Sequence, residues 1–429
     1  MVEQPSPAYP DSLPTRRRLY EIDLLRFVAA LAVVLLHYSF AQAKNDAELD
    51  FASELGAVTR YGYLGVDLFF MISGLVVFMS LWGRRPSAFL ISRISRLYPA
   101  YWVAVTLTTL TVVVLGARGR NDVTLPQYLV NLTMFPAPIN VEYVEGVYWT
   151  LWSEWRFYAL LFVLALIGLT VRRTRLFMWG WLATTVLLEL LPVPAEPVVA
   201  LAVQPLYSHY FIAGMVLYLV HRSGWSRELA VLLGLCFLNA SYQAAQLAEL
   251  RNRTEAAGLD PAVVVLVVTV IFLVMALVAS GALARWSSPA LLPLGEMTYP
   301  LYLIHGTLGY ALFNLLTPGV NRWILLLGVI VAMCALSWLI SQVIEARLRP
   351  RLRNGLSRTW AAVRTNLTVS PSVEERNETA VFLSQGKRDV PAHWQAPAVA
   401  SVAASPPDDR SPKAPRHPPG TEALHQRNN

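Results

Sequence analysis

Long apolar runs, separated by short polar segments, dominate the first 349 residues of the chain. A helix needs about 20 largely apolar residues to cross the roughly 30 Å hydrocarbon core of a bilayer. Ten runs reach about that length, and the polar segment 117–146 separates the third from the fourth. The pattern therefore predicts an all-α polytopic membrane protein, a bundle of about ten transmembrane helices within residues 19–349. The predicted spans are 20–42, 62–82, 98–116, 147–170, 175–192, 198–221, 226–244, 260–282, 290–315 and 322–346.

The composition supports this class. Of the 429 residues 55% are apolar and only 15% are charged, whereas roughly a quarter of the residues are charged in soluble domains. Residues 350–429 are polar and rich in proline, and we expect them to form a disordered cytoplasmic tail. Residues 1–18 are expected to form a short cytoplasmic segment. The two cysteines, Cys236 and Cys334, lie in apolar runs and match no metal-binding spacing, so no metal site is predicted.

The basic residues indicate an orientation. With a cytoplasmic N-terminus, the inner segments carry 17 arginines and the outer segments carry 7 lysines and arginines. Because positive charge favours the cytoplasmic side, we expect both termini in the cytoplasm of a plasma-membrane protein. We therefore attribute the net charge of +7 to the orientation of the protein in the bilayer, its expected partner, and not to the binding of nucleic acid. A cleaved signal peptide ending near 41–43 is less favoured, because the apolar run before it is long and contains Asp23, Arg26 and His37.

Ionisable side chains within spans are functional candidates, because burying charge in a bilayer is unfavourable. Arg26 and His37 are 11 positions apart in the first span. On a helix this separation turns about 1100°, or about 20° beyond three full turns, and covers roughly 16 Å. Both side chains therefore share one face, with Arg26 deeper toward the inside. Taken singly, each could instead extend toward the nearer membrane surface.

Three further ionisable residues are predicted at the depth of His37, in the outer half of the membrane: Asp67, Glu154 and His305. A carboxylate beside an imidazole fixes its tautomer and stabilises its protonated form. Structural alternatives remain open, since Asp67 could be a lone interfacial residue and Glu154 could pair with an arginine.

Two arginines are predicted at the inner rim of the membrane. Arg93 and Arg96 lie three positions apart, on one face of a short helix that Pro99 interrupts. Two guanidinium groups on one face suit a phosphate, although plain positive-inside charge would also explain them. Acid–base groups outside and anion-binding groups inside would together serve an elongated cytosolic anion whose reactive end reaches outward.

Five ordered motifs resemble the acyltransferase 3 family of integral-membrane O-acyltransferases. They are Arg26 with His37, Gly65-Val66-Asp67 with Phe69-Phe70 and Ser73-Gly74, Arg93 with Arg96 before Pro99, the aromatic segment from Trp149 to Tyr158 around Glu154, and the segment from Tyr299 to His305. The resemblance implies transfer of an acyl group, commonly acetyl from acetyl-CoA, to a hydroxyl of a carbohydrate or glycosylated acceptor. Acyl-CoA would be a co-substrate, and no tightly bound cofactor is expected.

The resemblance also implies residue roles. His37 is the expected general base or acyl carrier, with Asp67, Glu154 and His305 as further catalytic candidates. Arg26, Arg93 and Arg96 are expected to bind the donor. The main alternative is a multi-pass transporter or exporter, because intramembrane His, Asp and Glu also build proton relays. A membrane scaffold is a third possibility, but it leaves these polar residues unexplained.

Overall fold

The computed structural model describes residues 18–41, 51, 54–116, 123–191, 197–317 and 319–367. These residues form helices, turns and short connections, with no strand among them. The helices up to Arg364 belong to one compact unit. Most of the predicted N-terminal segment, the weighed cleavage site at 41–43 beyond Ala41, and the tail from residue 368 lie outside the described residues.

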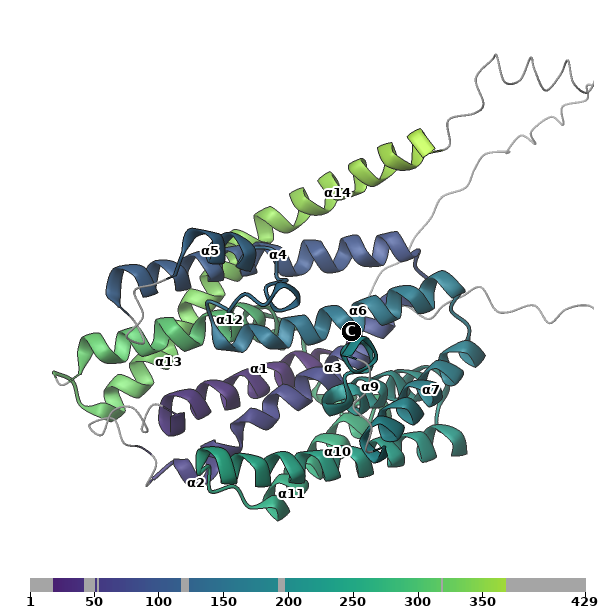
Figure 1. Cartoon of the computed structure of the whole chain (residues 1–429), viewed down its shortest axis with the longest axis horizontal. Coiled ribbons are helices and arrows are strands. Elements are labelled where there is room, and N and C mark those ends of the chain that lie inside the picture. The colour runs from purple at the N-terminus through teal and green to yellow at the C-terminus, as the bar shows by residue number, and fades with distance from the viewer. Residues whose placement is uncertain are drawn as a thin grey trace, which may run out of the picture. The chain divides into compact units, whose positions relative to one another are not determined.

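Every predicted span corresponds to a long helix, and Figure 1 shows these helices running beside one another. Eight stretches of the described chain are long and apolar enough to cross a membrane, which confirms the polytopic all-α class. The helices α7 and α12 are not among the eight, because α7 begins with several arginines and α12 carries many polar side chains. The long helices are α1 Tyr20–Leu35, α3 Gly65–Leu81, α4 Pro86–Leu115, α6 Trp149–Ile167, α7 Val171–Leu190, α9 Pro205–Ser223, α10 Arg227–Glu255, α11 Pro261–Ala279, α12 Leu292–Leu316, α13 Arg322–Leu339 and α14 Ala346–Leu367.

Short elements connect or extend the long helices. Two of them are π-helical: Leu36–Ala41 continues α1, and Ile340–Glu345 joins α13 to α14. The other short elements are the helices α2 Gly56–Thr59, α5 Leu125–Asn131 and α8 Pro197–Val203, and the 3₁₀ turns Arg60–Leu64, Ala137–Ile139, Gly146–Tyr148, Ala284–Trp286 and Pro289–Leu291. A π-helical turn inside a longer helix often marks a functional site, and the first of them contains His37.

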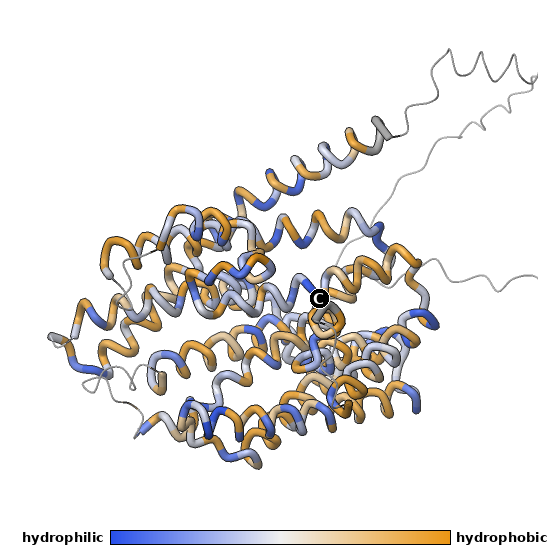
Figure 2. The backbone as a smooth tube through the Cα atoms, viewed as in Figure 1, coloured by the Kyte–Doolittle hydropathy of each residue, from blue (hydrophilic) through white to orange (hydrophobic). Residues whose placement is uncertain are grey.

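The helices consist largely of apolar residues, as Figure 2 shows by colour, and many large apolar side chains are exposed on the outer surface. Val114, Leu166 and Leu327 are each more than 60% exposed. In water such a surface would be unfavourable, but in a bilayer it faces lipid. Ionisable side chains such as Asp67, Arg93 and His305 are buried inside the unit instead. This arrangement, apolar outside and polar inside, is the one expected of a membrane enzyme or transporter.

Glycines bring three of the helices close together. A methyl group added at Gly65 of α3 would overlap the carbonyl oxygen of Ala29 in α1, and one added at Gly214 of α9 would overlap the carbonyl oxygen of Met71 in α3. The helix α3 therefore packs backbone to backbone between α1 and α9. This packing places the helix of Asp67 directly against the helix of His37.

Two local predictions are wrong. The helix α4 runs unbroken from Pro86 to Leu115 through Pro99, because proline removes one hydrogen bond that a long, packed helix tolerates. The helix α14 reaches Leu367, so residues 350–367 are helical where a disordered tail was expected. Leu348, Leu352 and Leu356, spaced four residues apart, give this segment one apolar helical stripe.

Candidate functional site

Three cavities follow one another through the interior of the helical unit. The basic cavity, of about 220 Å³, includes Arg18, Asp23 and Arg349 in its wall. The central cavity, of about 110 Å³, shares Arg26, Arg96, Gly295 and Tyr299 with it. The imidazole cavity, of about 450 Å³, contains His37 in its wall and shares Val66 and Tyr302 with the central cavity. The shared wall residues show that the cavities adjoin one another, with the predicted arginines at one end of the series and His37 at the other.

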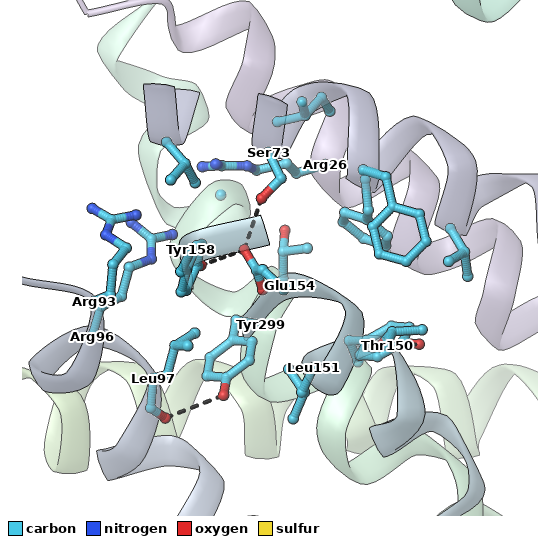
Figure 3. A pocket seen from close by; sticks show the side chains of 18 residues that line it. Arg26, Ser73, Arg93, Arg96, Leu97, Thr150, Leu151, Glu154, Tyr158 and Tyr299 are labelled. Carbon is cyan, nitrogen blue, oxygen red and sulfur yellow. Dashed lines mark hydrogen bonds between the residues drawn. The ribbon is translucent and has the colours of Figure 1, made fainter. Parts of the chain in front are cut away.

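The three predicted donor-binding arginines meet at the central cavity. Figure 3 shows Arg93 and Arg96 entering it from α4 and Arg26 from α1. Arg93 is only 8% exposed, and its Nε is buried with no hydrogen-bond partner within the described part of the chain. A buried donor without a partner is unfavourable unless a ligand accepts from it. The cluster therefore suits an anion with several acceptor oxygens.

One carboxylate organises the arginines at the basic cavity. Asp23 is buried and accepts two hydrogen bonds from Arg18, from Nε at 3.1 Å and from Nη2 at 3.0 Å. Its other oxygen lies 3.8 Å from Nη1 of Arg26. Gly295 of α12 leaves the space that the carboxylate fills, since a methyl group there would overlap it. Asp23 thus holds Arg26 in place while leaving part of its guanidinium for another partner.

Glu154 does not lie where the sequence prediction placed it. It lines the central cavity beside the arginines, and Oε1 accepts hydrogen bonds from Ser73 at 2.7 Å and from Tyr158 at 2.5 Å (Figure 3). The helix α6 begins at Trp149, close to the predicted start at residue 147, so depth along the helix does not explain the difference. The contacts with Ser73 and Tyr158 place Glu154 beside the arginines.

His37 and His305 form a hydrogen-bonded pair. Nδ1 of His37 lies 3.0 Å from Nε2 of His305, and Nδ1 of His305 lies 2.8 Å from the carbonyl oxygen of Tyr302. A carbonyl oxygen only accepts, so Nδ1 of His305 carries the proton. In the neutral ring Nε2 of His305 then accepts, and Nδ1 of His37 donates to it. Neutral His37 therefore has its lone pair on Nε2, as a general base requires.

The backbone around the pair is held by tyrosines. Tyr38 donates to the carbonyl oxygen of His305 at 2.6 Å, and Tyr310 donates to that of His37 at 3.3 Å. Gly309 allows the close approach of Tyr38, because a methyl group there would overlap its hydroxyl. The π-helical turn Leu36–Ala41 carries both His37 and Tyr38. These contacts fix the relative position of α12 and the end of α1.

Asp67 is buried and lines the imidazole cavity together with His37 and Arg251. Arg251 also stacks 4.3 Å above the ring of Tyr63. The hydrogen bond from His37 to His305 fixes the tautomer of His37, whereas the sequence analysis favoured a carboxylate for this role.

Sequence reasoning missed two residues of the imidazole cavity, Glu145 and Arg251. Glu145 lies near the end of the segment 117–146, which was interpreted as a polar loop, and Arg251 is one of the seven lysines and arginines that were assigned to the outer segments. Only the fold of segments distant in sequence brings them to His37. The same cavity is lined by aromatic side chains, namely Phe40, Tyr63, Trp149, Tyr207 and Tyr302.

A family model described as an acyltransferase domain matches residues 19–342. The chain is 26% identical over 338 residues to "Acyltransferase MdmB" of Streptomyces mycarofaciens, a match that covers 68% of this chain and 83% of that protein. No solved structure matches the chain significantly.

Proposed function

Because the chain belongs to the acyltransferase 3 family and is therefore an acyltransferase, we propose that it moves acetyl from acetyl-CoA to a hydroxyl of a carbohydrate or glycoside. The observation that carries the proposal is the His37–His305 pair in a cavity that adjoins the arginine cluster. His37 acts as general base or as transient acyl carrier, and the arginines bind the donor.

The donor enters at the basic cavity from the cytoplasm, with both termini on that side of the plasma membrane. Arg96 and Arg26 line both the basic and the central cavity, so they interact with the phosphates of the nucleotide. Arg93, with its buried Nε, adds a further donor. Guanidinium groups suit phosphate because they offer several N–H donors in a planar fork. The thioester end of the pantetheine arm extends toward Tyr302 and the imidazole cavity.

The acceptor binds in the imidazole cavity. Aromatic faces such as those of Trp149 and Tyr207 suit the apolar face of a sugar ring, while Asp67 and Arg251 supply polar groups for its hydroxyls. Nε2 of His37 takes the proton of the attacking hydroxyl as its oxygen bonds to the thioester carbonyl carbon. The C–S bond then breaks, and the imidazolium returns the proton to the sulfur of CoA. In the relay variant, Nε2 itself attacks the thioester carbon first, and the C–S bond breaks to release the CoA thiolate. The hydroxyl oxygen then attacks the acyl carbon, the bond to Nε2 breaks, and the hydroxyl proton passes to the thiolate.

Acyl transfer can be measured with the purified protein in nanodiscs, radiolabelled acetyl-CoA and a panel of glycosides. General-base assistance contributes about 10²–10⁴ to rate, so H37A should lose at least about a hundredfold in transfer. The control is H221A, since His221 is exposed at the end of α9 and contacts the carbonyl oxygen of Ala279. Near-normal transfer by folded H37A would remove His37 from the reaction. Movement of an unmodified glycoside without acetyl-CoA would favour the transporter alternative.

A further inference from the structure

We infer that Glu145 is a positioning residue, which holds the turn of α12 that carries His305 and thereby acts on His37. The inference rests on the proposed function, because it assumes that His37 works in acyl transfer. Glu145 comes from the connection before α6 and has no counterpart among the residues that the sequence motifs single out.

The carboxylate of Glu145 is built into α12. It is only 1% exposed, and Oε2 accepts the backbone N–H of Thr307 at 2.7 Å while Oε1 accepts that of Gly146 at 2.9 Å. A Cβ at Gly306 would lie 2.7 Å from both carboxylate oxygens. Gly306, which lies between His305 and Thr307, therefore makes room for Glu145 because it has no side chain.

Further hydrogen bonds join the same two segments. Tyr148 donates to the carbonyl oxygen of Leu303 at 3.3 Å, and the hydroxyl of Tyr302 lies 3.2 Å from the carbonyl oxygen of Val147. Thr150 lies 3.0 Å from that same hydroxyl. We call this set of contacts, between residues 145–150 and residues 302–307, the clasp. It holds both ends of the turn in which His305 lies.

The clasp affects catalysis through one atom. The Tyr302 carbonyl oxygen, inside the clasped turn, fixes the proton on Nδ1 of His305. That proton position makes Nε2 the acceptor for His37. A displacement of the turn by about 1 Å would stretch this bond, and misplacements of that size cost about a hundredfold in some enzymes.

A carboxylate suits this task better than an amide. Glu145 presents two acceptor oxygens to two N–H groups, whereas glutamine presents one oxygen and one NH₂. In E145Q the NH₂ would face either the N–H of Thr307 or that of Gly146, and two donors repel. The substitution preserves volume, so the expected change is a shift of the turn with the core otherwise filled.

The test compares E145Q with E142Q, the same change on an exposed side chain of the same connection. We expect E145Q to lower kcat by about 5–30-fold at most, because a residue that acts through His305 cannot cost more than the loss of that ring. Its KM for acetyl-CoA should stay within twofold, because the arginines line the other cavities. E142Q should match the wild type in both constants. A drop in kcat without a change in KM or in melting temperature is not expected of a merely structural residue.

A double-mutant cycle tests the route through His305. If Glu145 acts through that ring, E145Q in an H305A background should lower kcat no further. Where E145Q fails to fold, G306A disturbs the clasp from the opposite side and should give the same kinetic signature. The inference is overturned by a kcat within twofold of wild type in the folded variant, or by losses that multiply in the double mutant. Transfer by H37A would instead refute the proposed function.

Discussion

Replacing His305 by alanine tests the imidazole pair most directly. The substitution removes the acceptor that lies 3.0 Å from Nδ1 of His37. His37 then loses the partner that keeps its lone pair on Nε2. H305Q serves as a companion variant, because a glutamine oxygen at that place could still accept from Nδ1 while filling most of the buried volume.

The size of the effect follows from how the bond changes during the reaction. A neutral hydrogen bond contributes about 0.5–1.5 kcal/mol, and one to a charged group about 1.5–3 kcal/mol. When His37 takes a proton, its hydrogen bond to His305 changes from a neutral hydrogen bond to one that involves a charged group. Only the difference, about 1–2 kcal/mol, accelerates the chemical step. At 1.36 kcal/mol per factor of ten, this predicts a kcat about 5–30-fold lower in H305A.

The assay is release of CoA and labelling of a glycoside acceptor under saturating acetyl-CoA, with the melting temperature in nanodiscs as a check on folding. The expected order of kcat is wild type, H305Q, H305A and then H37A. The KM for acetyl-CoA should not change, because His305 lines neither the basic nor the central cavity. A folded H305A with kcat within twofold of the wild type would refute the tautomer argument.

The remaining predictions concern the donor site and the packing of the helices. R96A should raise the KM for acetyl-CoA at least about tenfold with a smaller effect on kcat, since a charged hydrogen bond contributes about 1.5–3 kcal/mol; an unchanged KM in initial-rate measurements would contradict the phosphate assignment. E154Q should likewise alter KM more than kcat, because Glu154 lies beside the arginines and not beside His37; the same rate measurements would contradict this if only kcat fell. G214A should reduce the free energy of unfolding by about 1–3 kcal/mol, seen as a lower melting temperature, because its methyl group meets the backbone of α3. The control G234A, with open space around it, should be neutral or slightly stabilising, and equal melting temperatures for the two variants would contradict the close packing of α3 and α9.

The sequence by itself determined the class of the protein and the path of its helices. Apolar runs of bilayer length are a property of local composition, so they predict spans without knowledge of neighbours. The helical spacing of Arg26 and His37, which is also a local property, predicted that both lie on one side of a helix. In the structure both side chains line interior cavities. Ordered motifs then indicated the family, which the match over residues 19–342 confirms.

The sequence predictions were wrong at two places, the helix around Pro99 and the end of the helical region. Pro99 reads as a helix breaker by its missing N–H, yet α4 continues through it because neighbouring helices support the chain. The end of the helical region was placed too early, because the arginine-rich stripe of α14 looks polar when averaged but amphipathic when plotted at helical spacing.

Only the tertiary structure decided which polar residues meet. Depth estimates grouped Glu154 with His37, but depth fixes a position along the bundle to within a turn and says nothing about which helix faces which. The rotation and contacts of α6 and α12 put Glu154 with the arginines and His305 against His37. Glu145 reaches Thr307 across 162 positions of sequence. Such a pairing depends on how whole helices pack, and no local pattern encodes it.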